Sequence, residues 1–244
     1  MKILTILVLS LGLLTIQINA KEEANKKAMS IIKEMLEANT LYLKSQSQDE
    51  FKMVVEGQDP RITLVSCSDS RVQNSAIDSS PENDLFVIRN IGNQLISNEG
   101  SVAYGIKHLK TPILLIMGHS RCGAIKAAMS DYSAENSAIR KEVSTLALSI
   151  QNSCERGDPQ KWIKNIVNNV HKQVEYSLQE YHNDVDKGTL MIVGAVFDFA
   201  NDMKHGYGQF NVVNINGEDV EEKFDALKVN VKDKDMIQTA SNSK

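Results

Sequence analysis

Three side chains with metal-binding chemistry follow two short apolar segments of this chain. Cys67 comes just after the apolar run at 62–65. His119 and Cys122 come just after a second run, at 113–117. Short apolar runs without polar alternation predict buried strands of a parallel sheet. Because open α/β sheets place ligands at the carboxyl ends of their strands, the three side chains converge if the two strands are neighbours.

Two thiolates and one imidazole suit Zn²⁺, which prefers four ligands in a tetrahedral arrangement. Three protein ligands leave the fourth position for water, as in catalytic rather than structural zinc sites. Zinc lowers the pKa of such a water to about 7 and so supplies hydroxide at neutral pH. The residue types therefore indicate a catalytic zinc site, although His-x-x-Cys alone is also typical of two buried core residues.

A carboxylate and a guanidinium lie close to the first cysteine in the sequence. Asp69 and Arg71 follow Cys67 at alternate positions, so in an extended segment all three side chains point to one side. The fork of N–H donors on arginine can lock a carboxylate in place. The held carboxylate can orient a zinc-bound hydroxide or occupy the open metal position itself. The alternative is a local surface ion pair of little energetic value.

The cysteines allow other interpretations. Cys67 can be a small buried apolar side chain, and Cys67 and Cys122 can form a disulfide in an oxidising compartment. The histidine in the second segment and the carboxylate after Cys67 argue against the disulfide. Cys154 fits no metal spacing, so we interpret it as a spare thiol.

The order of apolar runs predicts the fold class. Strands without polar alternation, separated by segments of helical spacing, are typical of a parallel sheet covered on both faces. We therefore expect an α/β fold with a mostly parallel central sheet flanked by helices and preceded by an N-terminal helical arm. The expected strands cover 62–65, 85–88, 113–117, 190–197 and 210–215, and the expected helices cover 28–43, 48–56, 98–109, 123–129, 138–148 and 162–181.

The first twenty residues have the pattern of a secretory signal peptide. Lys2 precedes an apolar run at 3–16, and Ala20 stands at a possible cleavage site. The run is short for a membrane span, which needs about twenty residues. We expect cleavage and export to the periplasm or the medium, with no membrane contact afterwards; the alternative is an uncleaved N-terminal anchor.

Length and composition limit the remaining possibilities. The chain has 244 residues, of which 42% are hydrophobic and 24% charged, enough to bury a core. We expect one domain at 21–217, followed by a charged, partly disordered tail at 218–244. A formal net charge of -4 without a basic block argues against nucleic-acid binding. Three cysteines are too few for a disulfide scaffold of this size.

Several segments together resemble the β-class carbonic anhydrases. Each motif is short, but they occur in the family's order and at its spacing over roughly residues 27–215. The matching segments are CSDSR at 67–71, FVIRNIGN at 86–93, SVAYGI at 101–106, GHSRCG at 118–123 and GAVFD at 194–198.

The resemblance implies a reaction and its central residues. Cys67, His119 and Cys122 would bind Zn²⁺, and Asp69 and Arg71 would form the dyad that gates and orients the fourth position. The implied activity is that of a lyase, the reversible hydration of carbon dioxide to bicarbonate and a proton by attack of a zinc-bound hydroxide.

The resemblance also implies a substrate pocket and an assembly. Gln58, Phe86 and Tyr104 match substrate-binding positions of plant-like members. In that family the pocket forms at a dimer interface, so these three would come from the neighbouring subunit of a homodimer or homotetramer. Core packing is the alternative for Phe86 and Tyr104, and a turn position is the alternative for Gln58.

Two other functions remain open from the sequence. One is a related zinc hydrolase that acts on carbonyl sulfide or carbon disulfide. The other is a non-catalytic zinc or redox protein, in which Cys67 and Cys122 store metal or cycle as a disulfide. Asp69 beside the ligands favours catalysis, since a storage site needs no oriented carboxylate.

Overall fold

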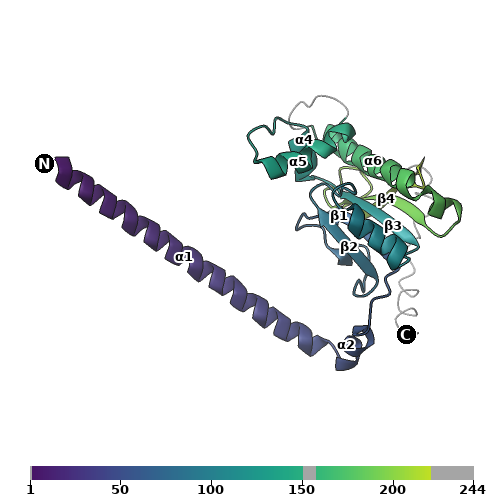
Figure 1. Ribbon diagram of the computed structural model, residues 1–244, viewed down its shortest axis with the longest axis horizontal. Coiled ribbons are helices and arrows are strands. Elements are labelled where there is room, and N and C mark those ends of the chain that lie inside the picture. Colours follow the sequence, from purple (N-terminus) through teal and green to yellow (C-terminus); the bar gives the residue numbers. More distant parts are fainter. Residues whose placement is uncertain (1, 151–157, 221–244) are drawn as a thin grey trace. The chain divides into compact units, whose positions relative to one another are not determined.

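The computed structural model describes residues 2–150 and 158–220, with side chains described from residue 20 onward (Figure 1). The chain divides into two compact units, residues 1–58 and residues 59–244. The domain expected at 21–217 therefore includes residues of both units. Cys154 and the tail from residue 221 lie outside the described residues.

The first unit consists of two helices, α1 (Lys2–Ser45) and α2 (Gln48–Val54). A capping box begins α2: the Ser47 hydroxyl accepts from the Glu50 amide at 3.2 Å, and the Glu50 carboxylate accepts from the Ser47 amide at 2.6 Å. The expected N-terminal helical arm is thus present. Within the described residues, no helix has both the length and the apolar character of a membrane span.

The second unit is built on a six-stranded sheet in the order β2-β1-β3-β4-β5-β6. Strands β2, β1, β3 and β4 are parallel to one another. Strand β5 runs antiparallel to β4, and β6 runs antiparallel to β5. The expected mostly parallel sheet is therefore confirmed. Its strands are β1 (Ile62–Cys67), β2 (Leu85–Asn90), β3 (Ile113–His119), β4 (Met191–Asp198), β5 (Gln209–Ile215) and β6 (Glu218–Asp219).

Neighbouring strands β1 and β3 pair in parallel from Ile62 with Ile113 to Ser66 with Met117. Cys67 ends β1 and His119 ends β3, so both residues lie at the same edge of the sheet. The condition set by the sequence, that the two strands be neighbours, is met.

The long helix α6 (Pro159–Asp186) packs on β3, β4 and β5 (Figure 1). It approaches closely at two glycines, because a Cβ at Gly118 or Gly194 would lie 2.9 or 2.7 Å from the Val170 side chain. Helix α3 (Glu99–Ala103) continues as a π-helical turn (Tyr104–His108) that packs on β1, and this pair replaces the single helix expected at 98–109. The described residues also form helices α4 (Gly123–Ala128) and α5 (Ser137–Thr145), and a 3₁₀ turn (Leu146–Ser149) follows α5.

The carboxyl-terminal boundary of the sheet differs from our expectation. We placed residues from 218 onward in the tail, but Glu218 and Asp219 form β6 and pair with Ile215 and Asn214. The reason is a tight turn at 216–217, where both residues have positive φ, 50° and 91°. The described fold extends to Val220, whose side chain is buried.

Candidate metal centre

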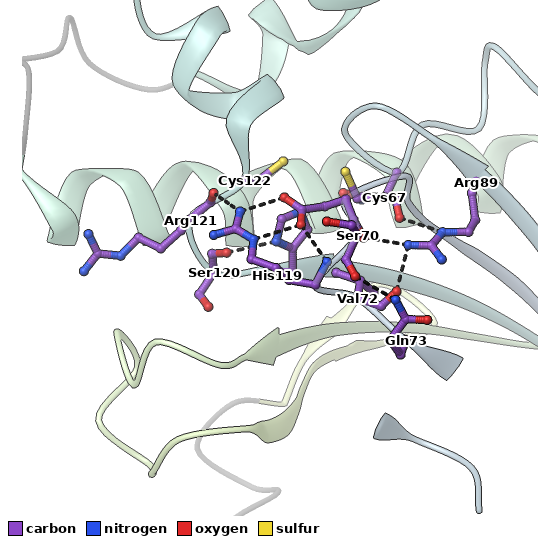
Figure 2. Close-up of polar contacts among 12 residues, drawn as sticks. Cys67, Ser70, Val72, Gln73, Arg89, His119, Ser120, Arg121 and Cys122 are labelled. Atoms are coloured by element: carbon purple, nitrogen blue, oxygen red, sulfur yellow. Dashed lines mark hydrogen bonds and ion pairs between the residues drawn. The ribbon is translucent and has the colours of Figure 1, made fainter. Parts of the chain in front are cut away.

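The side chains of Cys67, His119 and Cys122 meet at the carboxyl edge of the parallel strands. Their ligand atoms all lie within 4.8 Å of one another, and all three residues are buried. Cys122 is the N-cap of α4, so this short helix begins at the site. Figure 2 shows the two sulfur atoms near each other, with the imidazole beside them. The structure thus brings together the three ligands that the sequence suggested.

His119 is arranged as a metal ligand. Its Nδ1 lies 2.9 Å from the carbonyl oxygen of Ser120, so Nδ1 carries the proton and donates it there. Its Nε2 is buried and has no hydrogen-bond partner in the protein. A buried imidazole nitrogen without a partner is costly, and a metal ion would satisfy its lone pair.

Cys67 and Cys122 are both buried and form no disulfide. A hydrogen bond from Cys122 lowers the pKa of Cys67 to about 4 against the opposing effect of burial, and the nearby His119 side chain and the amide of Gly92 add to the lowering. The same contact with Cys67, together with burial, raises the pKa of Cys122 well above its usual value. The soft donor set and the orphaned nitrogen fit Zn²⁺.

Arg89, on β2, holds the loop that follows Cys67. Its Nε donates to the Cys67 carbonyl at 2.9 Å, and its Nη2 donates to the Asp69 and Val72 carbonyls at 2.8 Å each (Figure 2). This role of Arg89 was not predicted from the sequence, although the residue lies inside the FVIRNIGN segment at 86–93. The available signal was an arginine directly after the predicted strand at 85–88, at the same end as the strand that precedes Cys67.

The Asp69 carboxylate accepts three hydrogen bonds from Arg71. Arg71 donates to Oδ1 from its amide at 3.0 Å and from Nε at 2.9 Å, and to Oδ2 from Nη2 at 2.6 Å. These bonds hold the pKa of Asp69 below its usual range, so the carboxylate is ionised at neutral pH. Its Oδ2 lies 3.9 Å from Nε2 of His119, which places the dyad beside the metal position.

Phe86 and Tyr104 lie together but not beside this zinc site. Their ring centroids are 5.7 Å apart. Phe86 pairs with Thr63 near the start of β1, four residues before Cys67 in the register. At about 3.3 Å per residue this is about 13 Å along the strand. Both rings are therefore remote from the metal ligands of the same chain.

Gln58 lies in the first unit, where it is exposed. Its predicted contact with substrate stays a prediction.

Two side chains from the segment after β4 also reach the site, and the sequence analysis missed both. Phe199 stacks on the His119 imidazole with ring centroids 5.9 Å apart. Asp202 pairs with Arg121, which lies between the two ligands of the second motif. Both residues are about 80 positions from their partners in the sequence, so no local pattern marked them.

The comparisons with known proteins agree with this fold and this site. The family model for carbonic anhydrase matches residues 62–204, more than half of the chain and the whole of the site region. The chain belongs to the carbonic anhydrase family.

Curated relatives share shorter stretches with this chain. A carbonic anhydrase of Synechocystis is 40% identical over 92 residues, and one of Synechococcus elongatus is 38% identical over 89 residues. Carbonic anhydrase 2 of Mycobacterium tuberculosis is 36% identical over 87 residues. These alignments cover 34–35% of this chain. They cover 33% of the Synechococcus protein, 34% of the Synechocystis protein and 42% of the Mycobacterium protein, so the match spans less than half of each relative.

Solved structures share the fold over most of the chain. A β-carbonic anhydrase of Coccomyxa, in complex with acetazolamide, has a TM-score of 0.63 at 22% identity and covers 86% of this chain and 97% of its own. A tetrameric β-carbonic anhydrase of Sordaria macrospora has a TM-score of 0.64 at 23% identity, with coverage of 73% and 94%. The fold is thus that of the β-class.

Proposed function

We propose that this chain catalyses the reversible hydration of carbon dioxide to bicarbonate and a proton. One observation supports the proposal above all. A buried set of two sulfurs and one imidazole lies beside a carboxylate that an arginine fork holds ionised, with Asp69 Oδ2 3.9 Å from His119 Nε2. A storage or redox site does not need that carboxylate.

Cys67, His119 and Cys122 would hold Zn²⁺. When bound, zinc lowers the pKa of a coordinated water to about 7, which supplies a nucleophile near neutral pH. The protein contributes the orientation. Asp69 is ionised, so it can accept a hydrogen bond from the attacking water but cannot donate one, and this fixes which lone pair faces the carbon of the substrate.

Arg71 makes this orientation possible. Two of its three donors bond Oδ1 and only one bonds Oδ2, so Oδ2, 3.9 Å from His119 Nε2, can accept a further hydrogen bond. A free carboxylate could rotate and bind the metal directly. The Arg71 guanidinium therefore keeps the Asp69 carboxylate ionised and prevents it from rotating.

We place the substrate pocket at an interface between two copies of this chain. Phe86 and Tyr104 lie too far along the sheet to line the pocket of their own subunit, and Gln58 completes the plant-like set inferred from the resemblance. The proposed assembly is a homodimer or a homotetramer, and the related enzyme of Sordaria macrospora is described as tetrameric. The signal-like N-terminus supports export to the periplasm or the medium.

The reaction is tested by stopped-flow measurement of carbon dioxide hydration with zinc quantified per chain. We expect a fast reaction that needs one zinc per chain, and Asp69→Asn should keep zinc while slowing turnover by about tenfold or more. Fast hydrolysis of carbonyl sulfide or carbon disulfide without carbon dioxide hydration would favour the related hydrolase. Zinc binding without either reaction would contradict a catalytic role.

A further inference from the structure

The segment from Phe199 to Asp202 follows β4 and lies outside the residues so far assigned to the reaction. It is anchored by Asp198, a fully buried carboxylate. Oδ1 of Asp198 accepts from the amides of Ala200 at 3.2 Å and Asp202 at 3.1 Å, and Oδ2 accepts from the amide of Met203 at 2.7 Å. Three backbone donors on one carboxylate make this segment rigid, so its side chains are held in place.

Asp202 fixes the loop between the two ligands of the second motif. Its carboxylate accepts two parallel hydrogen bonds from Arg121, from Nε and from Nη2, each at 2.8 Å. Asp202 is only 5% exposed. Arg121 has a φ of 58°, a left-handed conformation that is strained for a residue with a side chain. The ion pair, buried on the Asp202 side only, offsets this strain and sets the orientation of the peptide that follows.

That peptide meets the catalytic dyad. The carbonyl oxygen of Arg121 accepts from Nη2 of Arg71 at 3.2 Å, and the same Nη2 donates to Asp69 at 2.6 Å. A continuous chain of contacts therefore leads from Asp202 through Arg121 and Arg71 to the Asp69 carboxylate. Each step is a hydrogen bond made by a charged group, so the geometry is directional.

Phe199 touches the same guanidinium from another side. The guanidinium carbon of Arg71 lies 4.7 Å from the centroid of the Phe199 ring, which is within cation–π range. The ring also stacks on the His119 imidazole, 5.9 Å away between centroids, and meets Phe197 edge-on. Phe199 therefore lies between a metal ligand and the arginine of the dyad.

Arg71 needs such support because its side chain is half exposed. An exposed ion pair between two side chains is weak and mobile. We propose that Phe199 and Asp202 are positioning residues that hold Arg71, and through it Asp69, in the orientation that the reaction needs. This inference rests on the proposed carbon dioxide hydration.

The test measures Asp202→Asn and Phe199→Leu in two backgrounds, the wild-type chain and Arg71→Lys. Asp202→Asn preserves the side-chain volume, and Phe199→Leu removes the aromatic ring but keeps an apolar side chain. Glu175→Gln is the matched control for Asp202→Asn, because it also removes one negative charge from an ion pair, here with Lys172 on the exposed side of α6. The measurements are kcat, KM, zinc per chain and Tm of the zinc-loaded protein.

We expect Asp202→Asn to lower kcat about tenfold and Phe199→Leu about threefold, with KM and zinc content unchanged. In the Arg71→Lys background neither substitution should lower kcat further, and the Tm shifts of Asp202→Asn and Arg71→Lys should be non-additive. Glu175→Gln should leave kcat unchanged.

The proposal is overturned if the two substitutions leave kcat unchanged in the wild-type background, or lower it equally in both backgrounds. It is also overturned if zinc loss accounts for the lower activity. An inactive wild-type protein with full zinc would instead refute the proposed reaction, and the Tm cycle would still report whether Asp202 acts through Arg71.

Discussion

Arg89 on β2 donates from Nε to the carbonyl oxygen of Cys67 on the adjacent strand β1, at 2.9 Å. The same guanidinium also reaches the carbonyls of Asp69 and Val72. One side chain thus fixes the backbone at a metal ligand, at the proposed orienting carboxylate and at Val72, directly after Arg71. The dyad and the first ligand are held by the same group.

Replacing Arg89 should weaken zinc binding. Arg89→Lys keeps the charge but lacks the planar guanidinium that bonds three carbonyls at once. The backbone after Cys67 is therefore no longer held in place. We expect zinc affinity to fall about 10- to 100-fold, the range typical of outer-shell partners. Competition with a chromogenic chelator measures it. Arg61→Lys, which alters an arginine–carboxylate pair with Asp84 at the other end of β1, is the control. Equal affinities for both variants and the wild type would refute the role of Arg89.

Gly92 should tolerate no side chain. Its φ is 82°, and a Cβ there would lie 2.9 Å from the Leu146 side chain. Gly92→Ala combines backbone strain with overpacking, so we expect a loss of about 2–4 kcal/mol in the free energy of unfolding. It should also weaken zinc binding, because the Gly92 amide donates to Cys67.

A substitution at Gly208 serves as a control that has the backbone strain without the overpacking. Its φ is 73°, but a Cβ at Gly208 meets nothing within 4 Å. Gly208→Ala should therefore cost only the conformational part, about 1 kcal/mol, and leave zinc affinity unchanged. Denaturant titration measures both variants. A Gly92→Ala protein as stable as Gly208→Ala would mean that the contact with Leu146 is not restrictive.

The metal-free protein should carry one thiolate at neutral pH. The pKa of Cys67 is lowered to about 4, so Cys67 is ionised above that pH and protonated below it. Cys122 keeps its proton because its pKa is raised. Ultraviolet absorbance of the thiolate follows the titration in a Cys154→Ser background, which removes the third thiol.

The partner thiol causes most of this shift. Cys122→Ala removes the donor that contributes most to the lowered pKa of Cys67. We expect the titration of Cys67 to move to higher pH in this variant. No thiolate below pH 7 in the parent protein, or an unshifted titration in the variant, would show that the two sulfurs are not in contact.

Mixed oligomers should reveal the shared pocket. Cys67→Ala abolishes the metal site of its own subunit, while Phe86→Ala damages the pocket that this chain lends to its neighbour. In a hybrid dimer of the two variants, one site carries both defects and the other carries neither. Unfolding and refolding an equal mixture should therefore restore activity above that of either variant alone. Absence of any restoration in a dimer of demonstrated mixed composition would place Phe86 in its own subunit's site.

The central fold could be predicted because its signals are local. The apolar runs before Cys67 and His119 mark buried parallel strands, and ligands at the ends of such strands meet when the strands are neighbours. Asp69 and Arg71 could be paired from their alternate spacing alone. These inferences need only short stretches of sequence.

The supporting residues could not be predicted, because their contacts depend on tertiary packing. Asp202 meets Arg121 only after β4 has paired with β3, and nothing near either residue in the sequence indicates the contact. The π-helical turn at Tyr104–His108 lies where the backbone packs tightly on β1, since a Cβ at Gly105 would overlap the Thr63 hydroxyl. Helical periodicity does not report such contacts.

X-ray absorption at the zinc edge, on protein purified with its native metal, tests the account most directly. We predict two sulfur ligands at about 2.3 Å and a histidine nitrogen at about 2.0–2.1 Å, with one light-atom ligand in addition. Cys122→Ala should lose one sulfur from this shell. A zinc shell without sulfur, or a disulfide between Cys67 and Cys122 in the native protein, would contradict the account.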